Sequence, residues 1–149
     1  MKYEIFIRED KKPAPFYKKA IAEYEKRLGR YCKISYKLVR KEKDWLKLMS
    51  PEPDRMAFWV VAGKDDLSSE GLSRMIADWE NSGVKKIIFL VDQPAEESEE
   101  RSSWRGGAEN GIPVLSLSGF AMPAAMTGMI LYEQIYRGYR ILHNQPYHK

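Results

Sequence analysis

The chain has 149 residues and a mass of 17.4 kDa, which is enough for one domain with a substantial buried core, and we expect residues 1–149 to form it. Hydrophobic residues make up 44% of the sequence and charged residues 31%, a balance that excludes a disordered chain. Cys32 is the only cysteine, so no intrachain disulfide is possible. No apolar run predicts a signal peptide or a membrane span, and we expect a cytoplasmic protein.

The formal net charge of +4 hides an uneven distribution. Residues 1–49 contain 15 Lys and Arg against 7 Asp and Glu, a net +8, whereas residues 50–110 contain 7 against 13, a net −6. The basic first third has two interpretations. It forms a surface that faces nucleic-acid phosphates, or it is the solvated face of an amphipathic helix within residues 17–30.

Strand and helix patterns alternate along the chain. A strand pattern at 2–8 is followed by helical spacing at 14–29, a strand pattern at 32–40 and a mixed segment at 43–54. The apolar run at 56–62 predicts a central strand, and helical spacing follows at 68–83. Further strands are predicted at 85–91 and 112–118, before a final helix from about Pro123 to Leu142. This order predicts an α/β fold with a mainly parallel sheet flanked by helices.

In such sheets, ligands bind in loops beyond the carboxyl ends of the strands. Here those loops read "AGKDDLSS" at 62–69, "DQPAEESEE" at 92–100 and "SLSGFAMP" at 116–123. The two histidines and Cys32 lack the spacing of a zinc site, so no metal is expected, and no P-loop occurs.

The end of the chain carries the most informative group of residues. Tyr132, Tyr136 and Tyr139 share one helix face, as core or subunit-interface residues do. The last residues, "NQPYHK", follow a stiffening proline and present a phenol, an imidazole and an amine. That set is suited to binding a phosphate, moving a proton or covering a cofactor pocket.

The segment "LYEQIYRGYRILHNQPYHK" resembles the C-terminal end of the ribosomal RNA large subunit methyltransferase H family, which are small knotted methyltransferases of the SPOUT class. "GKDDLSSEGLS" and "LSLSGFAMP" are similar in position as well. The resemblance implies a homodimer with a trefoil knot in its C-terminal half. It also implies that S-adenosylmethionine is the cofactor and that the reaction is N3-methylation of a pseudouridine in large-subunit ribosomal RNA.

The resemblance also implies roles for single residues. Tyr147, His148 and Arg137 would be catalytic, and Arg140 and Lys149 would hold RNA phosphates. Contacts to the cofactor would come from the three loops and the strands before them, at Trp59, Gly63, Asp92, Leu117, Ser118, Gly119, Phe120 and Met122.

Two segments depart from the family pattern. The family has a glycine-rich loop after the strand that ends at Val91, whereas this chain has "DQPAE" at 92–96. Ala124 and Gly128 stand where the family commonly has His and Arg. Two interpretations follow: an active, divergent enzyme in which Asp92 binds the cofactor's ribose hydroxyls, or a non-catalytic paralogue that binds RNA or the ribosome on the same scaffold.

Overall fold

The structure is a computed structural model, and it describes residues 1–8, 14–62, 67–92, 111–120 and 122–146. The predicted alternation of strands and helices is confirmed there. The mixed segment contains a further short helix, α2. In chain order the elements are β1 (Lys2–Arg8), α1 (Pro15–Leu28), β2 (Lys33–Val39), α2 (Glu42–Leu48), β3 (Arg55–Ala62), α3 (Ser69–Asn81), β4 (Lys86–Val91), β5 (Val114–Ser118) and α6 (Ala124–Leu142).

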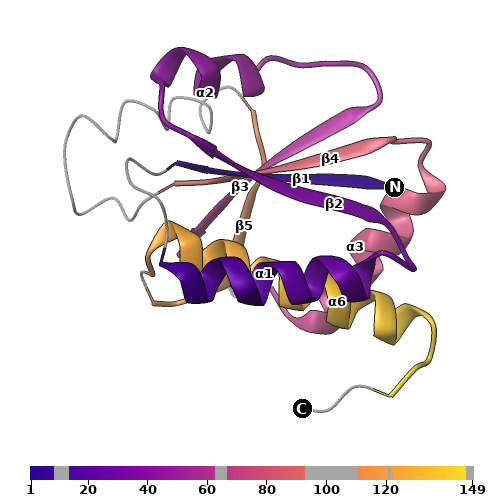
Figure 1. Cartoon of the computed structure of the whole chain (residues 1–149). Helices are drawn as coiled ribbons and strands as arrows, with labels where there is room; N and C mark the ends of the chain where they lie inside the picture. Colours follow the sequence, from indigo (N-terminus) through magenta and orange to yellow (C-terminus); the bar gives the residue numbers. More distant parts are fainter. Residues whose placement is uncertain (9–13, 63–66, 93–110, 121, 147–149) are drawn as a thin grey trace.

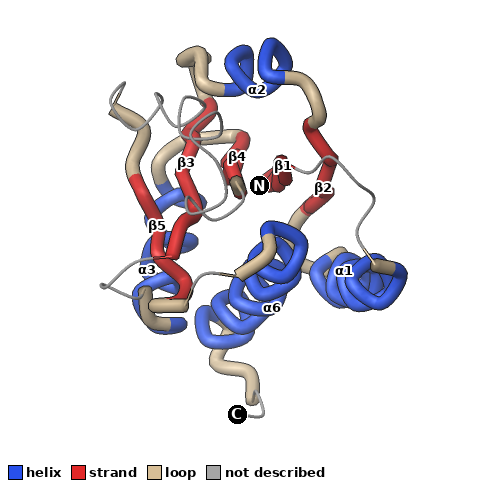
Figure 2. Tube along the Cα trace, turned by 90° about the vertical axis from the view of Figure 1, so that its left-hand side faces the viewer, coloured by secondary structure: helices blue, strands red, loops and turns tan. Residues whose placement is uncertain are grey.

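The five strands form one sheet in the order β2-β1-β4-β3-β5, and every neighbouring pair is parallel. Helices α1, α6 and α3 cover one face, and α2 lies over the other (Figure 1). Figure 2 shows the same three-layer arrangement from the side. The structure therefore confirms the predicted α/β fold with a parallel sheet between helices.

The strands alternate their side chains between two apolar clusters. Tyr3, Ile5 and Ile7 of β1 face the layer of three helices, and Phe6 faces α2. In β4, residues on both faces are buried, as its uninterrupted apolar sequence predicts. Burying one such side chain contributes about 1.5–3 kcal/mol, so these two clusters provide most of the driving force for folding.

Local sequence signals explain where the helices begin. Pro15 occupies the first turn of α1, where its missing N–H costs no hydrogen bond. The Ser68 hydroxyl caps α3 by accepting a hydrogen bond from the Gly71 N–H at 2.9 Å. After α3 the chain turns at Gly83, whose φ of +83° favours glycine.

Helix α6 runs antiparallel to the strands, across the helix face of β1. Near its start, a Cβ at Gly128 would lie 2.7 Å from Ile7 Cδ1, close to the carboxyl end of β1. Near its end, the Tyr139 hydroxyl lies 2.9 Å from the Tyr3 hydroxyl, close to the amino end of β1. The helix therefore begins at the carboxyl edge of the sheet and ends at the amino edge.

Two of the three tyrosines predicted to share a helix face lie in the core. Tyr132 and Tyr139 are buried, and Tyr136 is half-buried, so the core interpretation of this stripe is confirmed. The Tyr132 hydroxyl donates to Glu25 at 2.8 Å, and the Tyr139 hydroxyl donates to Glu80 at 2.7 Å.

Burial raises the pKa of Tyr3, Tyr132 and Tyr139 above the ordinary tyrosine value, because a phenolate is poorly solvated inside the protein. For Tyr132 and Tyr139, the acceptor carboxylates raise the pKa further. Burial also raises the pKa of the Cys32 thiol to about 12. All four groups stay protonated in the folded protein at alkaline pH.

These shifts predict a loss of stability at alkaline pH. The unfolded chain releases the tyrosine protons near pH 10 and the folded chain keeps them, so the stabilisation is complete below that pH and falls above it. Urea unfolding between pH 9 and 11 should show a free energy of unfolding that is nearly level close to pH 9 and falls above about pH 10, with a slope that approaches about 1.4 kcal/mol per pH unit for each such tyrosine. The Tyr132→Phe variant should show a shallower fall, and a flat profile for the wild type would contradict the assignment.

Candidate functional site

The parallel strands place several predicted cofactor residues at one edge of the sheet. Asp92 directly follows β4, and Leu117 and Ser118 end β5, with β3 between them. Gly119, Phe120 and Met122 lie in the link from β5 to α6. The structure thus brings Asp92 and this link to the same carboxyl edge, as sequence reasoning predicts, whereas Gly63 lies outside the described residues.

Trp59 does not reach that edge. Its side chain is 1% exposed and packs on Trp45 of α2, with ring centroids 5.5 Å apart. Its backbone N–H donates to the Pro113 carbonyl at 2.8 Å, in the ladder between β3 and β5. Its cofactor contact stays a prediction.

A buried ion pair joins the ends of β1 and β4. The Arg8 Nη1 and Asp92 Oδ2 atoms lie 3.4 Å apart, and the two side chains are 11% and 1% exposed. Removing a carboxylate from water costs several kcal/mol, so a buried carboxylate requires a positive partner. The opposite charge of Arg8 therefore permits Asp92 to stand at the end of an otherwise apolar strand.

The link between β5 and α6 presents an aromatic ring to solvent. The Ser118 hydroxyl accepts a hydrogen bond from the Phe120 N–H at 3.0 Å, which closes a tight turn. The Phe120 side chain is 81% exposed. Exposed aromatic rings are suited to stacking on flat ligand groups, and this ring follows β5 at the carboxyl edge of the sheet.

The two family departures on α6 belong to its packing. Ala124 is fully buried at the start of the helix. A Cβ on Gly128 would come within 2.7 Å of Ile7, so an arginine there would push the helix away from β1. The close approach of α6 to the sheet accounts for the small residue at position 128.

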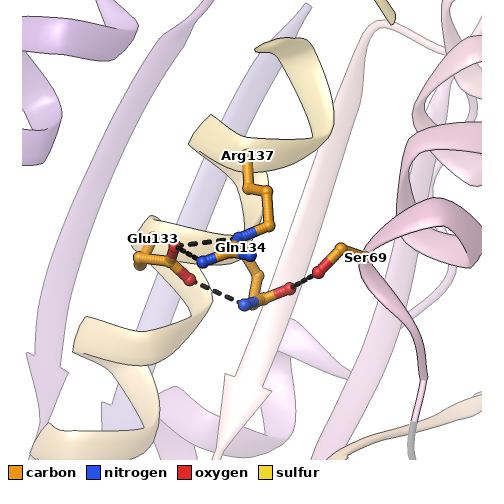
Figure 3. A network of polar contacts seen from close by, with 4 residues as sticks. All are labelled: Ser69, Glu133, Gln134 and Arg137. Carbon is orange, nitrogen blue, oxygen red and sulfur yellow. Dashed lines mark hydrogen bonds and ion pairs between the residues drawn. The ribbon is translucent and has the colours of Figure 1, made fainter. Parts of the chain in front are cut away.

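Arg137, a predicted catalytic residue, lies in a polar network on α6 (Figure 3). Its Nε and Nη2 atoms donate to the Glu133 carboxylate at 3.1 and 2.9 Å. The Gln134 amide donates to the same carboxylate and accepts from the Ser69 hydroxyl of α3. These contacts hold the guanidinium in one orientation against the helix.

Arg140, a predicted RNA-binding residue, anchors the beginning of the C-terminal tail. Its Nε donates to the Pro146 carbonyl at 3.1 Å and its Nη1 donates to Gln145 Oε1 at 3.2 Å. The Tyr31 hydroxyl donates to the same Gln145 oxygen. Tyr147, His148 and Lys149 lie outside the described residues, but the chain leading to them is tied to the end of α6.

One chain does not gather all the predicted residues into one place. Arg137 lies 13 residues along α6 from Ala124, which is a rise of about 20 Å along the helix axis. Arg137, Arg140 and the start of the tail therefore lie toward the amino edge. Asp92 and the link after β5 lie at the carboxyl edge.

Sequence reasoning missed Arg8, Glu133 and Gln145. Arg8 ends an apolar strand and Asp92 directly follows another, and these positions were the available signal. The sequence does not indicate that β1 pairs with β4, because five other elements lie between these two strands in the chain. Glu133 is four residues before Arg137, a spacing that favours ion pairs on a helix and could have been used.

The described residues contain no group of three or more His, Cys, Asp or Glu side chains placed to hold a metal ion. Among the helices that the structure describes, none combines the length and apolar character needed to cross a membrane.

Comparison with known proteins agrees with this architecture. Residues 1–148 match the family described as "Predicted SPOUT methyltransferase". The chain is 32% identical to Ribosomal RNA large subunit methyltransferase H 1 of Thermoanaerobacter sp. (strain X514), over all of both chains. It is 31% identical to Ribosomal RNA large subunit methyltransferase H of Syntrophomonas wolfei, again over all of both chains.

A further relative, Putative ribosomal RNA large subunit methyltransferase H of Methanococcus vannielii, is 31% identical over 87% of this chain and 89% of that protein. The chain therefore belongs to the SPOUT methyltransferases and, within that class, to the ribosomal RNA large subunit methyltransferase H family. The resemblance seen in its C-terminal residues is confirmed.

The buried ion pair generates a stability prediction. Arg8→Met leaves the Asp92 carboxylate without this partner, and we expect the free energy of unfolding to fall by about 3–5 kcal/mol. The double variant Arg8→Met/Asp92→Leu removes both charges and should lose less. Urea unfolding of both variants at pH 7 measures this. A larger loss in the double variant than in Arg8→Met would contradict the pairing.

Proposed function

We propose that this protein methylates large-subunit ribosomal RNA, using S-adenosylmethionine, at N3 of a pseudouridine. The full-length match to the ribosomal RNA large subunit methyltransferase H family carries the proposal. The placement of Asp92 and the link after β5 at the carboxyl edge of a parallel sheet supports it, since this is where ligands bind in such sheets.

The residues at the carboxyl edge fit such a cofactor. We assign the ribose hydroxyls to the Asp92 carboxylate, which Arg8 holds at this edge; because the Asp92 side chain is 1% exposed, cofactor binding would have to uncover it. The exposed Phe120 ring offers a face to the adenine. Backbone groups of Leu117, Ser118, Gly119 and Met122 would complete the contacts. When bound, the cofactor supplies an electrophilic methyl group.

The proposed roles of the tail follow from the chemistry of the target. An imide nitrogen must lose its proton before it attacks a methyl group, so a base and a positive charge near the imide oxygens are required. We assign Tyr147 and His148 to the target base and to proton removal, and Arg137 to the developing negative charge. Arg140 would hold the tail in place, and with Lys149 it would bind RNA phosphates.

The separation of these residues supports a homodimer with shared sites. Three apolar residues of α6 are half-buried, namely Met126, Ile130 and Ile141. Their helical spacing puts them on one face with Glu133 and Arg137, which lie between Ile130 and Ile141 along the helix. Two copies that pack these faces together in antiparallel fashion would place the tail of one chain beside the carboxyl edge of the other. Each complete site would then use residues of both chains.

We further propose that residues 1–149 form one domain with the trefoil knot of the SPOUT class in its C-terminal half. The strand order supports this. From β4 the chain passes beyond β3 to place β5 at the sheet edge, and α6 then returns beneath β1.

A rival function follows from the buried Asp92. Its carboxylate pairs with Arg8 where the family has an open glycine loop, so a non-catalytic protein that binds ribosomal RNA or the ribosome is the alternative. Calorimetric titration with S-adenosylhomocysteine separates the two functions. We expect binding with a dissociation constant of about 1 μM to 1 mM, the usual range for enzyme ligands.

Asp92→Asn should weaken that binding about tenfold or more, because hydrogen bonds to a charged group contribute about 1.5–3 kcal/mol. Asp78→Asn, at an exposed position on α3, is the matched control and should bind like the wild type. An absence of heat at millimolar ligand would overturn the enzymatic proposal in favour of its rival.

The tail generates a separate prediction. Deleting Tyr147, His148 and Lys149 should change the free energy of unfolding by less than about 1 kcal/mol, since terminal surface residues contribute little. Transfer of a tritiated methyl group to large ribosomal subunits should be abolished. Unfolding or loss of the dimer on deletion would show instead that the tail is a structural element.

A further inference from the structure

The amino edge of the sheet contains a basic hollow that none of the assigned roles uses. It has a volume of about 490 Å³, and its lining includes Tyr31, Cys32 and four basic residues, Lys2, Arg30, Lys33 and Lys85. The four basic side chains come from the starts of β1 and β2, the turn after α1 and the turn before β4, and all are exposed. Parallel strand starts thus bring together cations that lie far apart in the sequence.

The acidic residues nearby neutralise only part of this charge. Glu4 lies 3.2 Å from Lys2 but also 3.1 Å from Lys86, and its carboxylate is shared between them. Burial would raise the pKa of Glu4, but these two lysines outweigh it and lower that pKa. Asp54 lies 3.6 Å from Lys85 in an exposed pair, which contributes little in water.

Two further observations concern the net charge of the hollow. A further acid, Glu80, accepts the hydrogen bond from the Tyr139 hydroxyl. Within the described part of the chain, Arg30 and Lys33 form no ion pair, so their charges are available to an anionic ligand.

We propose that this amino-edge hollow binds the phosphate backbone of the RNA substrate, an inference that rests on the proposed function in RNA. Exposed lysine and arginine clusters bind phosphates and release counterions. The Tyr31 ring already lies against Tyr139 and His143, with centroids 5.3 and 5.2 Å away, and we infer that these contacts disfavour stacking on a base. The hollow therefore contacts the sugar-phosphate backbone of the RNA and does not read its bases.

The hollow also adjoins the tail. The hydroxyl of Tyr31, which lines the hollow, donates to Gln145, two residues before Tyr147. An RNA strand bound here would pass close to Gln145, at the start of the tail of the same chain. The hollow thus holds the flanking backbone while the tail meets the modified nucleotide.

The test compares two double variants that lose equal charge. Arg30→Gln/Lys33→Gln removes the available cations of the hollow, and Lys41→Gln/Lys43→Gln removes two exposed lysines at α2, on the other face of the sheet. Fluorescence anisotropy with a labelled 20-nucleotide RNA hairpin measures affinity between 50 and 300 mM KCl. All three proteins are also titrated with S-adenosylhomocysteine.

We expect the hollow variant to lose affinity about tenfold or more, and the slope of log K against log salt to become shallower by roughly 1.4–1.8 for two lost phosphate contacts. The α2 variant should behave like the wild type. Equal RNA affinity of the hollow variant and the wild type would overturn the proposal. So would displacement of the hairpin by inorganic phosphate but not by chloride of equal ionic strength, because the hollow would then be a site for a small phosphate.

The two proposals fail in different ways. If the wild type binds no S-adenosylhomocysteine but the hollow variant still loses RNA affinity, the methyltransferase proposal fails and the hollow stands. If S-adenosylhomocysteine binds and RNA affinity is unchanged in the hollow variant, only the hollow fails.

Discussion

The close packing of α6 against β1 is the constraint on which the rest of this structure depends. Gly128 meets Ile7 at one end of the strand, and Tyr139 meets Tyr3 at the other, so the helix spans the sheet from edge to edge. Gly138 allows the same closeness to α3, because a Cβ there would lie 2.8 Å from Ile76. With both contacts made, the helix can neither slide nor tilt without opening the core.

This packing determines where functional groups stand. The start of α6 receives the link that carries Phe120, and its end delivers Arg140 and the tail to the opposite edge. The proposed cofactor site and the start of the tail are therefore held apart within one chain. This separation is the reason we propose a dimer in which each chain completes the other's site, and the proposed RNA-binding hollow lies near the start of the tail.

The pairing of Arg8 with Asp92 is the second constraint. Two charges at the ends of the central strands cost desolvation energy, which apolar or glycine residues would avoid. A carboxylate held there in one orientation is suited to binding ribose hydroxyls. In a protein that binds no cofactor, the desolvation energy of this pair would bring no gain in ligand binding. Titration with S-adenosylhomocysteine therefore distinguishes the two functions.

Much of the fold could be predicted from sequence because its signals are local. The uninterrupted apolar run of β4 indicates a central strand, and the spacing of Tyr132 and Tyr139 indicates a buried helix face. Helix α2 escaped prediction because it has seven residues and buries only Trp45. Its short apolar pattern does not distinguish a helix from a loop.

The candidate site was less predictable because its contacts join distant segments. The partner of Asp92 lies 84 residues away, and only the strand order reveals it. The guanidinium of Arg140, which the resemblance assigns to RNA phosphates, donates to the Pro146 carbonyl, and the assigned role stays a prediction. Neither contact leaves a spacing pattern in the sequence.

Subunit complementation tests the central claim most directly, namely that each site is built from the carboxyl edge of one chain and the tail of another. A heterodimer of an Asp92→Asn chain and a chain lacking residues 147–149 is purified through two different tags, and its methyl transfer to large ribosomal subunits is measured. At a cofactor concentration well below the wild-type dissociation constant, the account predicts about a tenth or less of wild-type activity for the Asp92→Asn homodimer, none for the truncated homodimer, and close to half for the heterodimer, which has one intact site of two. A heterodimer as inactive as its parents would contradict it.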